Sequence, residues 1–128
     1  MKIGMTGIFV NNPLEAFAFY TEVLGFANRM YVPEANLAIV VSPEDPDGTG
    51  LLLEPTDNPI GKNFQEALYK AGIPAIVFSS AAIQKEYERL KNRGVVFKKE
   101  PTKTDWGTET VFDDTCGNWI QLFQPEDA

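Results

Sequence analysis

The chain has 128 residues, of which 44% are hydrophobic and 23% charged, so it is long enough for one domain with a sizeable core. Its net charge of −7 excludes nucleic acid and anionic membrane surfaces as expected partners, because both need a basic surface. The absence of histidine removes the commonest general base and the commonest transition-metal ligand. A single cysteine, Cys116, with no signal-peptide pattern and no long apolar run, predicts a cytoplasmic protein without disulfides.

The first half of the chain predicts a strand, a helix and three further strands. After a strand at residues 3–10, Asn12 is typical of a helix N-cap, and Pro13 suits the first helical position. The helix should continue to about Leu24 and end at Gly25, which can adopt the left-handed conformation. Its apolar face is formed by Ala16, Phe19, Tyr20, Val23 and Leu24. Three strands and an acidic, solvated turn follow, with the strands at 26–32, 36–42 and 51–55 and the turn at 43–48.

The second half repeats this order after a connector at residues 56–74 that holds a short helix, 63–71. A strand at 75–79 leads to a helix at 81–93, for which Ser80 is the expected N-cap and Gly94 the expected end. Further strands are predicted at 95–99, about 106–113 and 119–124.

Each half therefore has the pattern βαβββ, and corresponding residues lie about seventy positions apart, as Pro55 and Pro125 do. Two copies of this length indicate one pseudo-symmetric domain, not a solenoid. The predicted class is α+β, with module one at about 3–55 and module two at about 75–125. Two curved sheets would leave a groove between the modules, which is the default place for a ligand.

The motifs of the two modules resemble those of the vicinal oxygen chelate superfamily, which includes glyoxalase I, bleomycin-resistance proteins and extradiol dioxygenases. The matching segments run through nearly the whole chain in order, at residues 19–26, 88–95 and 112–122. The resemblance implies two paired βαβββ modules whose curved mixed sheets enclose a groove. It also implies a homodimer, which would cover exposed edge strands.

In the metalloenzymes of that superfamily, histidine or glutamate from the first and last strand of each module holds a divalent metal. The resemblance places those positions at Met5, at Ala75, at Gln121 and at either Leu51 or Leu52. Thioether, methyl, amide and isobutyl groups are not ligands for such metals. We therefore expect no metal and no cofactor, and the usual basis of glyoxalase or dioxygenase chemistry is missing.

Strand alternation on the first and last strands predicts which side chains line the groove, and Tyr31 and Trp106 are added because their residue types supply flat apolar walls with a polar group. The expected lining residues are Met5, Phe9, Tyr31, Glu54, Ala75, Trp106, Phe112, Gln121 and Phe123. For Met5 and Ala75, filling of the core explains the pattern equally well, and Trp106 is also typical of a rim or subunit contact. Glu54 could bind a cation or act as a base at the mouth of the groove, or be a solvated acid at a strand end.

Three functional hypotheses remain open on the sequence. The first is a metal-free binding protein for a small organic molecule, for which the acidic net charge is compatible with a cationic ligand. The second is a metal-independent lyase or isomerase with Glu54 or a tyrosine as the acid–base group. The third is a structural or regulatory dimer. An open acidic pocket would favour the first, and a groove filled by Met5, Phe9 and Phe123 would favour the third.

Overall fold

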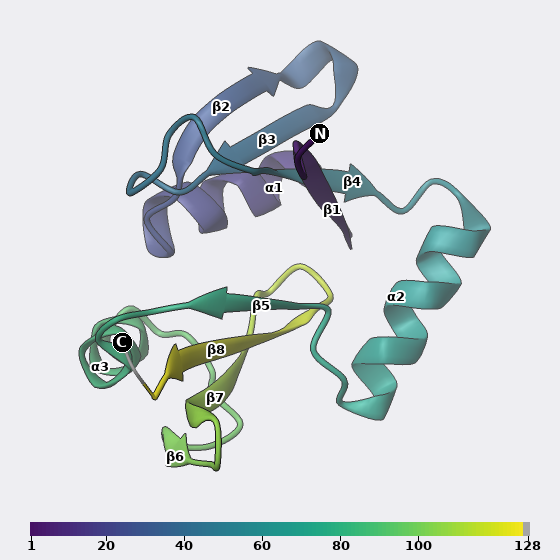
Figure 1. Cartoon of the computed structure of the whole chain (residues 1–128). Coiled ribbons are helices and arrows are strands. Elements are labelled where there is room, and N and C mark those ends of the chain that lie inside the picture. Colours follow the sequence, from purple (N-terminus) through teal and green to yellow (C-terminus); the bar gives the residue numbers. More distant parts are fainter. Residues whose placement is uncertain (127–128) are drawn as a thin grey trace. The chain divides into compact units, whose positions relative to one another are not determined.

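A computed structural model describes residues 1–126, which form two four-stranded mixed sheets with accompanying helices (Figure 1). The fold is α+β, as the sequence predicts. The elements in chain order are β1 (Met5–Val10), α1 (Pro13–Ala18), the π-helical turn η1 (Phe19–Val23), β2 (Ala27–Val32), the 3-10 turn η2 (Pro33–Ala35), β3 (Leu37–Val41), β4 (Gly50–Pro55), α2 (Pro59–Ala71), β5 (Ile76–Ser79), α3 (Ile83–Asn92), β6 (Thr102–Lys103), β7 (Gly107–Asp113) and β8 (Trp119–Pro125). Within residues 1–126, no helix has the length and apolar character needed to cross a bilayer.

The two sheets share one topology. Their strand orders are β1-β4-β3-β2 and β5-β8-β7-β6, so each strand of the first has a counterpart in the second. In both sheets, the first and last strands of the module pair in parallel and the remaining pairs are antiparallel. The repeat seen in the sequence is therefore a repeat of strand order and direction.

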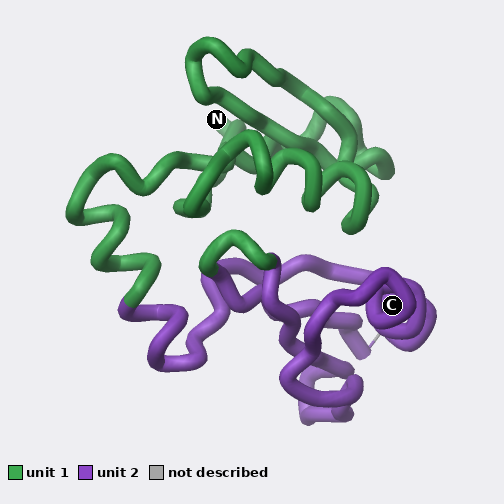
Figure 2. Tube along the Cα trace, turned by 180° about the vertical axis from the view of Figure 1, so that it is seen from behind, with its two compact units in different colours: residues 1–66, 115–117 green, residues 67–114, 118–128 purple. Residues whose placement is uncertain are grey.

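The chain divides into two compact units (Figure 2). Unit 1 contains residues 1–66 together with 115–117, and unit 2 contains residues 67–114 and the chain from 118 onward, so the division falls within α2. In unit 1, the buried amide of Gln65 donates to the carbonyl oxygens of Phe9 (2.9 Å) and Cys116 (3.1 Å). The backbone N–H of Asn11 also donates to the Cys116 carbonyl, at 3.0 Å. These bonds hold residues 115–117 in unit 1.

The core of unit 1 lies between the first helix and one face of its sheet. The Asn12 side chain caps α1 as predicted, accepting hydrogen bonds from the N–H groups of Leu14 (3.0 Å) and Glu15 (3.2 Å). The helix continues through η1, and Gly25, with φ of 93°, ends it. This helix and the facing strands bury Ala16, Tyr20, Val10, Val40 and Leu53.

The core of unit 2 forms in the same way around α3, whose buried residues Ile83, Tyr87 and Leu90 are those at helical spacing. The Phe97 ring contacts the rings of Tyr87 and Phe112, with centroids 4.6 and 5.6 Å apart. Phe112 is only 1% exposed. Aromatic burial of this kind dominates the energetics of a small core.

Three local predictions were wrong. The helix expected at 63–71 begins at Pro59, because the Asn58 side chain accepts from the N–H of Ile60 (2.8 Å). The helix expected at Ala81 begins at Ile83, whose N–H donates to the side-chain oxygen of Gln124, 2.8 Å away in β8. Gln124, which is distant in sequence, thus accepts the first N–H of the helix, where Ser80 was the expected cap.

The strand expected at 95–99 is reduced to one bridge between Phe97 and Phe112, and the short β6 pairs with β7 in its place. Pro101 accounts for the interruption, because it has no N–H to donate and restricts the residue before it. The Thr110 hydroxyl donates to the Lys99 carbonyl at 2.6 Å, so a side chain satisfies this acceptor where the ladder is broken.

Truncation of Phe112 to alanine should lower the free energy of unfolding by about 3–5 kcal/mol, because it leaves a cavity in the unit 2 core. Val111→Ala, on the other face of the same strand, is the matched control and should cost less than half as much. Chemical denaturation monitored by circular dichroism measures both. Equal effects would show that Phe112 does not face the core.

Candidate functional site

One face of the unit 1 sheet lies opposite its helix and carries the residues predicted at the former ligand positions. The register pairs Gly7 with Leu52 and Phe9 with Glu54, and Leu52 in turn with Ile39. Residues alternate along each strand, so one set of side chains projects from this side. We call it the unit 1 face; it includes Met5, Gly7, Phe9, Met30, Ile39, Gly50, Leu52 and Glu54, and the Arg29 side chain packs over Gly50.

This register resolves which leucine shares a face with Met5. Leu51 pairs with Val40 and is buried on the helix side, whereas Leu52 lies opposite Gly7 on the unit 1 face. Met5 itself is 51% exposed. Of the two leucines, Leu52 is the one on the face of Met5, and its side chain carries no donor atom.

The Glu54 carboxylate lies over Gly7. A methyl group at Gly7 would sit 3.0 Å from Oε2 of Glu54, which is closer than most real contacts of a Cβ. Glu54 is half-buried, and within residues 1–126 it forms no hydrogen bond and no ion pair. A half-buried carboxylate on a largely apolar surface is available to pair with a positively charged group.

Phe9 is the strand neighbour of Glu54 on this face. Its ring packs on Gly61 in α2, where a Cβ would lie 2.6 Å from a ring carbon, and it meets the edge of Phe64 at 6.4 Å between centroids. Gly61 therefore permits the close approach that fixes this ring beside the carboxylate.

The corresponding face of unit 2 lies opposite α3. Trp119, Gln121 and Phe123 alternate with the buried Ile120 and Leu122, as predicted. The register pairs Gln121 with both Val77 and Val111, while the N–H of Ala75 donates to the Trp119 carbonyl at 2.9 Å. We call this surface the unit 2 face; it includes Ala75, Val77, Ser79, Glu109, Val111, Asp113, Trp119, Gln121 and Phe123.

An aromatic and charged cluster fixes one end of the unit 2 face. Trp119 stacks on Tyr69 with centroids 5.0 Å apart and donates from its indole N–H to the Tyr69 carbonyl at 3.1 Å. The Lys98 ammonium lies 4.3 Å from the centroid of the Trp119 ring. Sequence reasoning gave no role here to Tyr69 or Lys98, because both lie far from the strand in sequence.

The Tyr69 hydroxyl donates to the Asp113 carboxylate at 2.6 Å. That hydrogen bond, together with burial and the charges of Asp113 and Asp114, raises the pKa of Tyr69 from 10.0 to about 12. Tyr69 is therefore a neutral donor at physiological pH, and it holds the cluster together.

For two predicted lining residues the face assignment was wrong. Tyr31 pairs with Ala38 and stacks on Phe17 of α1, with centroids 4.3 Å apart, so it belongs to the helix side of unit 1. A register shift between Asn28 and Met30 is the cause, since one extra residue reverses the alternation. Phe112 pairs with Ile120, so the two side chains share one face of the sheet. That face packs on α3, and both residues are buried there.

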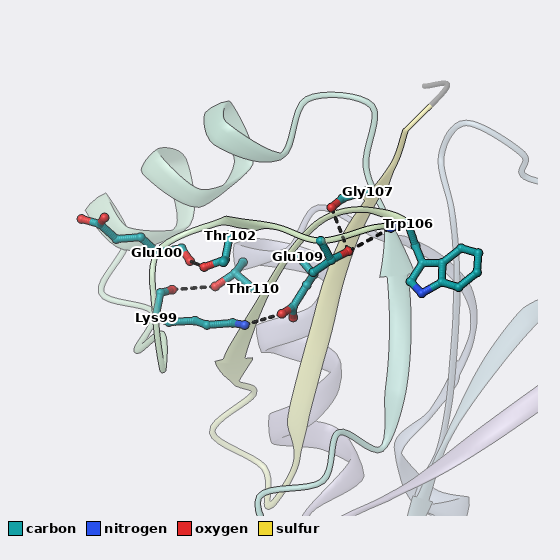
Figure 3. Close-up of polar contacts among 8 residues, drawn as sticks. Lys99, Glu100, Thr102, Trp106, Gly107, Glu109 and Thr110 are labelled. Atoms are coloured by element: carbon teal, nitrogen blue, oxygen red, sulfur yellow. Dashed lines mark hydrogen bonds and ion pairs between the residues drawn. The ribbon is translucent and has the colours of Figure 1, made fainter.

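Trp106 lies where β6 turns into β7 and is 81% exposed (Figure 3). Its backbone N–H donates to the Thr104 hydroxyl (3.2 Å), and its indole points away from the polar contacts of the hairpin. An ion pair between Lys99 and Glu109, drawn in the same view, ties the segment to β7. Within residues 1–126, no hydrogen bond or ring contact fixes the indole in place.

An open cleft in unit 1 has a volume of about 580 Å³ and lies beside the acidic loop at residues 43–49. Lys2, Arg29, Asp45 and Asp47 are among its lining residues, so its charges are of both signs. The Arg29 guanidinium donates to the carbonyls of Pro46 (2.6 Å) and Gly48 (3.0 Å). Arg29 thus serves to hold the loop.

The donor atoms present do not fit the metal site that the resemblance implies. Met5 and Leu52 lie on the unit 1 face, and Ala75 and Gln121 on the unit 2 face. Within residues 1–126, no three or more histidine, cysteine, aspartate or glutamate side chains are grouped so as to hold a metal ion.

Comparison with known proteins identifies the family. The sequence model of the Glyoxalase/Bleomycin resistance protein/Dioxygenase superfamily matches residues 2–122, and the chain belongs to this superfamily. It is 51% identical to the uncharacterized protein YurT of Bacillus subtilis strain 168 over 126 residues, which cover 97% of this chain and 99% of YurT. It is 32% identical to YetH of the same organism over 124 residues, 94% of this chain and 96% of YetH.

Two solved structures are similar over nearly their full length. The crystal structure of UcmS2 has a TM-score of 0.79 and 32% identity, covering 96% of this chain and 97% of UcmS2. TnmS3, an antibiotic binding protein from Streptomyces sp. CB03234, has a TM-score of 0.77 and 23% identity, covering 98% of this chain and 97% of TnmS3. The second likeness shows the fold alone.

The raised pKa of Tyr69 predicts a loss of stability in alkali. An unfolded tyrosine ionises near pH 10, so this contribution is constant below pH 10 and is lost between pH 10 and about 12. Asp113→Asn should bring the pKa of Tyr69 back towards 10, and Tyr69→Phe should abolish the corresponding titration. Tyrosinate absorbance of the folded protein measures both; an unchanged titration in Asp113→Asn would contradict the assigned cause.

Proposed function

We propose that this protein binds a small organic molecule, without a metal ion, on the two faces that lie opposite α1 and α3. The observation that carries the proposal is the apolar character of those faces at Met5, Leu52 and Ala75, where the resemblance implies metal ligands. Met5 and Leu52 present a thioether and an isobutyl group, and few polar groups remain beside them. Apolar surface with a small number of placed polar groups is the usual composition of organic ligand sites.

The unit 2 face supports the same reading. Phe123 supplies an aromatic ring that lies over Gly107, where a Cβ would be 3.0 Å from the ring, and Gln121 supplies one neutral amide beside Val77. Val77 is 53% exposed. The fold is also compatible with a binding role, since TnmS3 is an antibiotic binding protein.

A thermal-shift screen against a library of organic molecules tests the proposal. A ligand that binds only the folded state at a hundredfold excess over its Kd adds about 2.7 kcal/mol to the free energy of unfolding, which raises Tm by several degrees. For hits that contact the unit 2 face, Phe123→Ala should weaken binding several-fold, because it removes a stacking ring. Val96→Ala, an exposed position, is the control. A library without any hit would contradict the proposal.

The protein should contain no stoichiometric transition metal when it is purified without chelator. Elemental analysis by mass spectrometry checks this. Stoichiometric zinc, nickel or iron in the wild-type protein would contradict the assignment of Met5, Leu52, Ala75 and Gln121 as non-ligands.

We further propose that the chain forms a homodimer in solution. Both β1 and β2 are edge strands of their sheet, and such edges expose backbone groups that a second copy can cover. Light scattering at micromolar concentration should give twice the 14.2 kDa of one chain. A single species at the mass of one chain would be evidence against the dimer.

A further inference from the structure

We propose that the unit 1 face recognises an organic cation, with Glu54 as its counter-ion and Phe9 as the aromatic surface beside it. This inference rests on the proposed binding function and specifies the chemical class of the ligand.

The first support is charge. Glu54 carries the only carboxylate on the unit 1 face, and its neighbours across the strands are aliphatic and aromatic groups. It forms no hydrogen bond and no ion pair within residues 1–126. A carboxylate in such surroundings gains from a ligand that brings a positive charge together with apolar surface.

The second support is the position of the carboxylate. Gly7 leaves room above the sheet, and the side chain of Glu54 fills it, with Oε2 3.0 Å from the point where a Cβ of residue 7 would lie. The carboxylate is thereby drawn in over the face instead of extending from the strand end into solvent. We assign Gly7 as a positioning residue for this charge.

The third support is the ring beside it. Phe9 lies directly across the strand pair from Glu54, and Gly61 and Phe64 hold its ring in place. A carboxylate next to an aromatic ring provides both an ion pair and a cation–π contact, a combination suited to alkyl or aromatic ammonium groups.

Arg29 is the cationic side chain that packs on the same side of the sheet, and it does not neutralise Glu54. Arg29 lies beside Gly50, where a Cβ would be 3.6 Å from Nη1, and its other nitrogen donates to the carbonyls of Pro46 and Gly48. Gly50 precedes Glu54 by four residues in β4, a separation of roughly 13 Å in an extended strand. Arg29 therefore leaves the charge of Glu54 available.

A metal ion fits this surface poorly. Calcium and magnesium require several oxygen ligands, and the face offers one carboxylate among Met5, Met30 and Leu52. A large, weakly hydrated cation keeps its charge near Glu54 while its carbon atoms contact the methionines. The expected ligand is thus a quaternary or aromatic ammonium compound.

The experiment compares N-methylquinolinium with quinoline, which share a ring system and differ in charge at neutral pH. The protein is labelled with ¹³C at its methionine methyl groups, so that Met5 and Met30 report on the unit 1 face and the exposed Met1 serves as reference. Both probes should shift the Met5 and Met30 signals. The cation should bind about three- to fivefold more tightly, as expected for a partly exposed ion pair.

Two variants separate a specific charge from the general acidity of the protein. Glu54→Gln should remove the preference for the cation and leave the Kd of quinoline unchanged, and Gly7→Ala should reduce the same preference by displacing the carboxylate. Glu34→Gln, the same change at an exposed position in η2, is the matched control and should retain the preference.

Equal affinities of the two probes for the wild-type protein, or a preference retained in Glu54→Gln, would overturn the inference about charge while the proposed binding function stands. Methyl shifts that depend on protein concentration without any probe would show that a second copy covers this face, which also overturns it. If neither probe shifts Met5 or Met30 at millimolar concentration, the unit 1 face is not the binding surface, and hits from the thermal-shift screen must belong elsewhere.

Discussion

Each sheet of this protein buries one face against a helix, and that single constraint decides the role of most residues in the strands. Alternation along a strand sends neighbouring side chains to opposite faces, so burial of Ile8 and Val10 under α1 places Gly7 and Phe9 on the other side. In unit 2, burial of Ile120 and Leu122 under α3 does the same for Gln121 and Phe123. The surfaces on which we place ligand binding follow from where the core lies.

The repeat has kept its topology while its chemistry has diverged. The strand pairs of Gly7 with Leu52 and of Val77 with Gln121 occupy equivalent places in the two sheets. One step further along, the partner of Phe9 is Glu54, whereas the partner of Ser79 is Phe123. A carboxylate in unit 1 thus corresponds to a phenyl ring in unit 2. Equivalent backbones here carry different recognition groups, which is why the family alone does not define the ligand.

Side chains that bond to distant backbone groups hold elements in place where the local sequence is insufficient. Gln65 bonds to the carbonyls of Phe9 and Cys116, Gln124 caps α3, and the indole of Trp119 bonds to Tyr69. Each satisfies a polar group that would otherwise be costly to bury. They are contacts between residues about 40 to 56 positions apart in the sequence, so no local pattern announces them.

The sequence by itself determined the two βαβββ modules, the cap of α1 at Asn12, the glycines that end the helices, and the absence of histidine and carboxylate side chains at Met5, Ala75 and Gln121. These depend on local spacing and residue type, which are visible in one dimension. The tertiary structure alone decided that Leu52 and not Leu51 shares the face of Met5, because that depends on which partner each strand residue meets. The tertiary structure also placed two predicted lining residues on the helix sides. Tyr31 lies there after a register shift in β2, and Phe112 lies there because it pairs with Ile120. The position of the Glu54 carboxylate over Gly7 also depends on the tertiary structure. The space beside a glycine is defined only once the neighbouring strand has paired with it.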